Sequence, residues 1–161
     1  PERSSDWQKD VQQIDNCEGG EPRMSESRKD VLLKALEAEV GGISIELGTL
    51  FTADVVGWSP YALVSGLQAL AELAALREEA FSNVVIGLRG LDEVGNKAFA
   101  EWLIEADHTG PLVLGDDAVV EATGRHVMLP GVTVADFREG KIRSYRTYFD
   151  DLSLIEQIAG A

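Results

Sequence analysis

Apolar residues recur along this chain first at helical spacing and later at every second position. Helical spacing predicts helices over residues 28–40, 44–51, 66–81 and about 150–158. Alternation and short apolar runs predict strands over residues 53–59, 83–91, 96–108, 125–137 and 141–149. Helices followed by long strands in hairpins indicate an α+β fold, with helices on the concave side of one curved sheet. Such a sheet leaves a conical cavity, a usual ligand site.

Several residues mark the expected ends of these elements. Ser27, with Asp30 three positions on, resembles a weak capping box, and Gly41-Gly42 is expected to stop the first helix. Pro130-Gly131 suggests a bulge or bend, because proline cannot donate to a strand ladder. Glu139-Gly140 predicts a hairpin turn, and residues 112–122 are expected to form a loop or ragged edge.

One histidine continues the apolar row of the strand at 96–108. Its alternating positions share one face: Ala98, Ala100, Trp102, Ile104, Ala106 and His108. The opposite face carries Glu105 and Asp107. An imidazole in this row is partly desolvated and needs a partner, which in a plain core histidine is a backbone carbonyl.

The last strand also offers polar groups to a cavity. Alternation puts Arg143, Tyr145, Thr147 and Phe149 on one face, and either face could point inward. If Tyr145 and Thr147 point inward, they become neighbours of His108. A neutral imidazole can then move a proton, while the phenol donates to a developing oxyanion.

Each candidate also has a plainer interpretation. Tyr145 could be a structural residue with its hydroxyl in water, and Asp107 could belong to a solvated strand face rather than act as an inward base. Trp58 and Trp102 are expected as pocket walls, although a lone tryptophan is more often core. Further candidate ligand contacts are Val56, Ile104 and Phe149.

Composition narrows the range of partners. The net charge of −14 and the scattered basic residues argue against nucleic acid and anionic membranes. One cysteine, Cys17, excludes an internal disulfide framework and fits a reducing cytoplasm. Two histidines in dissimilar surroundings give little support for a zinc site.

Residues 1–25 are expected to be a mobile polar leader before a single domain at 26–161.

Familiar catalytic signatures are absent from the sequence. The glycines fit neither of the two common phosphate-binding loops, and no GxSxG motif is present. The candidate chemistry that remains is therefore acid–base catalysis in an apolar pocket.

Four motifs carry a family resemblance over roughly Val31 to Gly160. They are FTADVVGWSP, W-x-I-x-A-x-HTG, TGR at Thr123 to Arg125, and F-x-EGKI-x5-YFD from Phe137. The chain resembles the nuclear-transport-factor-2-like superfamily, and within it the SnoaL-like polyketide cyclases and ester-cyclase-like proteins. The resemblance implies a cone-shaped α+β barrel, a hydrophobic pocket, commonly a homodimer, and no metal or organic cofactor. His108 falls where these families also place histidine.

The end of the chain also resembles limonene-epoxide hydrolases, which activate water with an arginine and two aspartates. Thr147 stands where that family has a catalytic aspartate. The other two positions fall on Ala106 and His108, or on Glu105 and Asp107 if the register shifts by one. In either register the full catalytic set of one arginine and two aspartates is missing.

Three hypotheses follow. The first is a SnoaL-like cyclase or isomerase of a small hydrophobic carbonyl compound, with His108 as acid/base and Tyr145 and Thr147 polarising or positioning. The second is a non-catalytic module that binds a small molecule or a protein. The third is an epoxide hydrolase that uses Asp107 in an altered catalytic set.

Overall fold

The structure, a computed structural model, describes residues 26–40, 46–114 and 118–160. Its helices are α1 (Arg28–Val40), α2 (Leu47–Leu50), α3 (Gly66–Ala80) and α4 (Asp151–Ala159). Its strands are β1 (Phe51–Ser59), β2 (Ala62–Ser65), β3 (Phe81–Val94), β4 (Lys97–His108), β5 (Leu112–Leu114), β6 (Ala118–Val120), β7 (His126–Arg138) and β8 (Lys141–Phe149). The expected leader, Cys17 and Gly41-Gly42 lie outside the described residues. Within those residues, no helix is long and apolar enough to cross a membrane.

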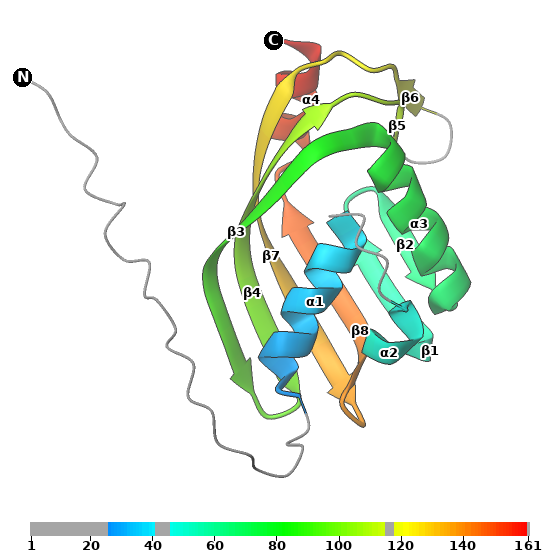
Figure 1. The fold of residues 1–161 in the computed structure, drawn as a ribbon, viewed down its shortest axis with the longest axis vertical. Coiled ribbons are helices and arrows are strands. Elements are labelled where there is room, and N and C mark those ends of the chain that lie inside the picture. The colour runs from blue at the N-terminus through cyan, green and yellow to red at the C-terminus, as the bar shows by residue number, and fades with distance from the viewer. Residues whose placement is uncertain (1–25, 41–45, 115–117, 161) are drawn as a thin grey trace, which may run out of the picture.

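Six strands form one curved sheet in the order β2-β1-β8-β7-β4-β3. All neighbouring pairs are antiparallel except β1 with β8, which run parallel. The upper halves of β3 and β4 bend toward α3, and α1 lies against the concave face (Figure 1). This α+β arrangement confirms the fold class predicted from the sequence.

The main core lies between the concave face and the helices. From α1, the buried side chains include Leu32 and Leu36, and from the sheet they include Ala100, Trp102 and Ile142. The short α4 packs against β7, where the Gln157 side chain bonds both the N–H and the carbonyl of Met128. Apolar residues from the helices and from the inner face of the sheet thus form one core around the cavity described below.

Most predicted boundaries agree with the structure. Ser27 caps α1, since its Oγ accepts from the Asp30 amide at 3.2 Å and donates to the Asp30 carboxylate at 2.7 Å. Glu139 and Gly140 have φ values of 52° and 78°, as a two-residue hairpin turn requires. Two predictions differ: α2 is a single turn, because Phe51 already begins β1, and residues 112–114 and 118–120 pair as the small β5–β6 hairpin rather than forming only a loop.

The prediction of a bulge at Pro130-Gly131 is wrong. The ladder between β4 and β7 runs through both residues without a change of register. Met128, two positions before Pro130, turns its N–H and carbonyl toward Gln157 of α4. Backbone groups two apart point the same way, and β8 pairs with β7 only from Gly131 onward. The missing N–H of Pro130 therefore faces an edge that has no strand partner, where proline is tolerated.

A register shift does occur opposite Arg143. Phe137 pairs with Ile142 and Asp136 with Ser144, so β8 holds one extra residue at this point. As a result Ile142 and Tyr145 are both buried while Arg143 is exposed. The predicted grouping of Arg143 with Tyr145 on one face is therefore wrong, although Tyr145, Thr147 and Phe149 do share the inner face.

Candidate functional site

A cavity of about 300 Å³ lies between the concave face of the sheet and the helices. Most of its wall is aliphatic or aromatic, with Ile104 and Ala106 from β4, Val127 and Leu129 from β7, and Phe149 from β8. This composition suits a small hydrophobic molecule, for which a few polar groups would fix the orientation.

An ion pair between two helices supplies the charged groups of the wall. Glu39 of α1 and Arg77 of α3 both line the cavity, and Arg77 Nη1 donates to Glu39 Oε2 at 3.0 Å. Glu39 is only 7% exposed. Burial raises the pKa of Glu39, and the Arg77 charge opposes that rise. The cavity thus contains a desolvated carboxyl group that is paired with one neighbouring cation.

Tyr145 lies close to this ion pair, and the charges of both partners act on its phenol. Burial raises the pKa of the Tyr145 phenol far above its usual range, with the Glu39 charge adding to the rise and Arg77 opposing it. Its ring crosses β1 at Gly57, where an added Cβ would come within 2.2 Å of Tyr145 Cζ. Its hydroxyl is buried without a hydrogen-bond partner among the described residues. Tyr145 is not part of the cavity wall, so it is a neighbour of Glu39 rather than a surface for the ligand.

Three side chains form a hydrogen-bonded chain beneath the cavity. Trp102 Nε1 donates to Thr133 Oγ1 at 3.1 Å, and Thr133 Oγ1 lies 3.1 Å from Thr147 Oγ1. Trp102 and Thr147 line the cavity, whereas Thr133 is 3% exposed and lies between them. The register that pairs Trp58 with Arg146 also brings Ser59, another wall residue, beside Thr147. Hydroxyl groups therefore follow one row across β1, β8 and β7.

Four of the predicted site residues meet in this wall: Trp102, Ile104, Thr147 and Phe149. Two others do not. Val56 and Trp58 are 48% and 41% exposed, and Trp58 packs against Tyr148 on the outer face with ring centroids 5.3 Å apart. The prediction that they form pocket walls is corrected, because the inner positions of this part of β1 are Val55, Gly57 and Ser59.

His108 is buried but lies outside the cavity wall. Its exposed fraction is 0%, and its ring packs on Phe81, a wall residue, with centroids 5.6 Å apart. Nδ1 lies 3.0 Å from Thr123 Oγ1, while the backbone of His108 bonds that of Arg125 and Gly124. Burial lowers the pKa of His108, partly offset by the Gly110 backbone. These contacts are those of a core histidine that fastens residues 123–125 to the sheet.

The expected cluster of His108 with Tyr145 and Thr147 does not form. Thr147 pairs with Thr133, which pairs with Ala100, eight residues before His108 on β4. At strand spacing this is about 26 Å along β4. The sequence left open which face of β8 points inward. The structure puts all three residues on the inner face, but the strand register separates them along that face.

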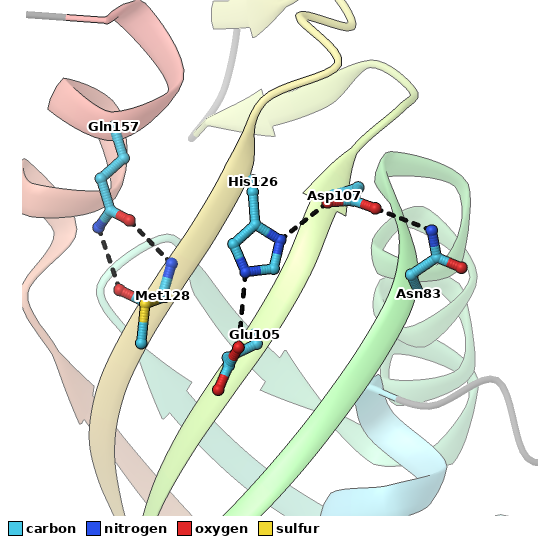
Figure 2. Close-up of polar contacts among 6 residues, drawn as sticks. All are labelled: Asn83, Glu105, Asp107, His126, Met128 and Gln157. Carbon is cyan, nitrogen blue, oxygen red and sulfur yellow. Dashed lines mark hydrogen bonds and ion pairs between the residues drawn. The ribbon is translucent and has the colours of Figure 1, made fainter. Parts of the chain in front are cut away.

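Asp107 faces outward, not into the cavity. Figure 2 shows its carboxylate between Asn83 and His126, and Glu105 on the other side of that imidazole. Asp107 accepts from Asn83 Nδ2 at 2.8 Å and contacts His126 Nδ1 at 2.9 Å, while His126 Nε2 lies 3.5 Å from Glu105. Asn83 and then His126 hold the pKa of Asp107 below its usual value. Asp107 as an inward base is therefore corrected to a member of a partly solvated cluster.

Glu39 and Arg77 were not among the site residues predicted from the sequence. A signal for Glu39 was present, since it lies three positions after Leu36 and so continues the buried stripe of α1. Arg77 lies seven positions after Leu70, which is buried on α3. In the described part of the chain, no group of three or more histidine, cysteine or acidic residues is arranged to hold a metal.

The fold and the cavity together define an α+β protein with a curved sheet and a largely apolar cavity. A family model described as a SnoaL-like domain matches residues 36–145, so the chain belongs to the SnoaL-like family. Among curated proteins, none matches the chain.

Three solved structures show the same fold at low identity. A proposed SnoaL-like polyketide cyclase from Jannaschia sp. CCS1 is 17% identical, with a TM-score of 0.69 over 89% of this chain and 99% of that one. A proposed isomerase from Rhodopseudomonas palustris is 16% identical, with a TM-score of 0.68 over 86% and 100%. A Catenulispora acidiphila protein with a ketosteroid isomerase-like fold, in complex with trimethylamine, is 19% identical, with a TM-score of 0.64 over 81% and 92%.

Proposed function

We propose that this protein is a general acid/base cyclase or isomerase of a small hydrophobic carbonyl compound, and that Glu39 transfers the proton. The observation that carries the proposal is a carboxyl group, 7% exposed, in the wall of a largely apolar cavity. Burial raises the pKa of Glu39. A carboxylate made more basic in this way is suited to remove a proton from the carbon next to a carbonyl.

Arg77 has two roles in this proposal. Its charge opposes the rise in the pKa of Glu39 and so favours the carboxylate form, which is the form that accepts a proton. Because Arg77 also lines the cavity, its guanidinium can stabilise the negative charge that develops as the proton leaves carbon. The apolar remainder of the wall excludes water and strengthens both effects.

The proposal gives Glu39 the proton-transfer role that the sequence suggested for His108. His108 lies behind Phe81, outside the wall, and burial lowers the pKa of its ring. Glu39 is in the wall itself. The reaction class, a proton transfer that leads to cyclisation or isomerisation, remains the one predicted from the sequence.

Hydrogen–deuterium exchange tests this proposal without a known substrate. Small cyclic ketones are incubated with the protein in D₂O, and loss of the proton signal next to the carbonyl is followed by NMR. We expect wild-type protein to accelerate exchange and Glu39→Gln to abolish the acceleration. Glu37→Gln is the matched control, because Glu37 is on the same helix but does not line the cavity. Equal exchange by wild type and Glu39→Gln would refute the role of Glu39.

Two other results would favour the alternative functions. Ketone binding with no exchange and no chemical change would indicate a binding module, an alternative supported by Thr147 in place of a carboxylate. Diol formation from a bulky epoxide would indicate an epoxide hydrolase. That reaction would need another arrangement of its acidic groups, because Ala106 lines the cavity while Glu105 and Asp107 contact His126 on the outer face.

The homodimer implied by the family resemblance is also retained as a proposal. The outer face of the sheet carries exposed apolar side chains that no helix of the described chain covers, including Val56, Trp58, Met128, Val132 and Tyr148. Covering these side chains with the same face of a second copy would remove apolar surface from water.

A further inference from the structure

The direction of the hydrogen bonds beneath the cavity can be worked out from the groups involved. An indole N–H only donates, so Trp102 fixes Thr133 Oγ1 as an acceptor. The Thr133 hydroxyl has one proton of its own to donate. Thr133 is 3% exposed, and a buried hydroxyl proton needs an acceptor.

Within the described residues, the acceptor found for that proton is Thr147 Oγ1, 3.1 Å away. Thr133 therefore donates to Thr147, and the Thr147 oxygen is the acceptor of this bond. The Thr147 hydroxyl then still has its own proton, which it can donate to another group. Thr147 lines the cavity, and no hydrogen bond from its hydroxyl to another group, the neighbouring Ser59 included, is found within the described residues, so this proton is directed toward the ligand space.

We infer that Thr147 is a specificity-determining residue whose hydroxyl donates to the carbonyl oxygen of a neutral ketone or ester bound in the cavity. The chain Trp102–Thr133–Thr147 makes this position a donor, so it favours ligands with an acceptor oxygen over hydrocarbons of the same shape. This inference rests on the proposed function for the identity of the ligand as a carbonyl compound.

The position of Thr147 also fits proton transfer at Glu39. Thr147 is two residues from Tyr145 on β8, about 7 Å along the strand. The Glu39 charge contributes to the raised pKa of Tyr145, so the carboxylate lies near that residue. A carbonyl oxygen held at Thr147 would therefore place the adjacent carbon at the Glu39 end of the cavity, with the apolar body of the ligand directed toward Ile104 and Val127.

The test compares two probes of nearly equal shape, 1-tetralone and its hydrocarbon counterpart tetralin. Dissociation constants are measured by calorimetry or by quenching of tryptophan fluorescence. Wild-type protein should bind tetralone more tightly than tetralin. Thr147→Val, which keeps the side-chain shape, should weaken tetralone binding about fivefold, the value of one hydrogen bond, and leave tetralin binding unchanged. Thr147→Ser should keep the ketone preference.

A second variant tests the chain itself. Thr133→Val removes the donor to Thr147 and should reduce the ketone preference while Thr147 is still present. An unchanged ketone preference in Thr147→Val would overturn the inference, as would wild-type protein that does not bind tetralone or that binds both probes equally. Glu39→Gln separates the two proposals: it should abolish proton exchange and keep the ketone preference. If exchange proves independent of Glu39 while Thr147→Val loses the preference, the proposed function fails and the binding role of Thr147 stands.

Discussion

Replacing Gly131 by alanine should disturb the wall of the cavity from beneath. The indole of Trp102 lies across Gly131, its partner in the β4–β7 ladder. A Cβ at residue 131 would come within 2.3 Å of Trp102 Cη2 and 2.4 Å of Cζ2. No carbon–carbon contact is stable at that separation, so the ring would have to move by about 1 Å or more to reach van der Waals distance.

Two costs follow from that movement. Overpacking a filled core site costs about 1–3 kcal/mol. Displacing the ring also strains or breaks the bond from Trp102 Nε1 to Thr133, worth about 1 kcal/mol when both groups are buried. We therefore expect Gly131→Ala to lower the free energy of unfolding by about 2–4 kcal/mol.

Urea denaturation followed by circular dichroism measures this loss. Gly87→Ala is the matched control, because Gly87 lies in β3 of the same sheet and its added Cβ would meet only Leu103 O at 3.7 Å. That control should be neutral or slightly stabilising, since alanine restricts the unfolded chain more than glycine does. If Gly131→Ala were as stable as Gly87→Ala, Trp102 could not lie where the structure places it.

Three further predictions concern charge and assembly. Arg77→Met should leave Glu39 buried without its cation, lowering the free energy of unfolding at neutral pH by about 3–5 kcal/mol. This loss should recover as acid protonates Glu39, which urea titrations at several pH values would show. Because burial lowers the pKa of His108, the folded state binds fewer protons, and stability should fall as pH drops from about 6.5 toward the lower folded pKa. The hydrogen bond to Asp107 raises the pKa of His126, so the stability that His126 contributes should instead fade as pH rises from about 6.5 through the folded pKa. The variants His108→Gln and His126→Gln separate the two pH dependences of the free energy of unfolding. Trp58→Glu should convert the proposed dimer to monomer in sedimentation velocity, and an unchanged mass would move the interface away from the outer sheet face.

Alternation along the chain was enough to predict much of the sheet. In β4 every second residue from Ala98 to Ala106 points inward, as the sequence indicated, because one face of the strand is buried throughout. The same reasoning found Trp102 and Ile104 in the wall. It also placed His108 on the inner side, although not in the cavity.

Strand irregularities explain the errors in face assignment. The extra residue at Arg143 reverses the alternation of β8, and β1 shifts register against β8 between Phe51 and Val56. In β1 the inner positions near the site include Gly57, which the Tyr145 ring covers, so the larger Trp58 lies outside. Single-strand periodicity contains no information about these contacts with neighbouring strands.

The charged pair could be predicted only in part. Glu39 lies on the buried stripe of α1, and the sequence shows it as an acidic residue at a position where an apolar one is expected. Its partner, Arg77, is 38 residues away on another helix. The packing of α1 against α3 decides that the two meet, and no local pattern determines that packing.

The most direct test of the account is the titration of the Glu39 carboxyl group by carbon-13 NMR, assigned by its loss in Glu39→Gln. We predict a pKa above the ordinary glutamate value of about 4.3, because burial outweighs the opposing charge of Arg77. The signal should also move when a cyclic ketone such as 1-tetralone is added. A Glu39 that titrates at the ordinary value and does not respond to the ketone would contradict the proposed acid/base site.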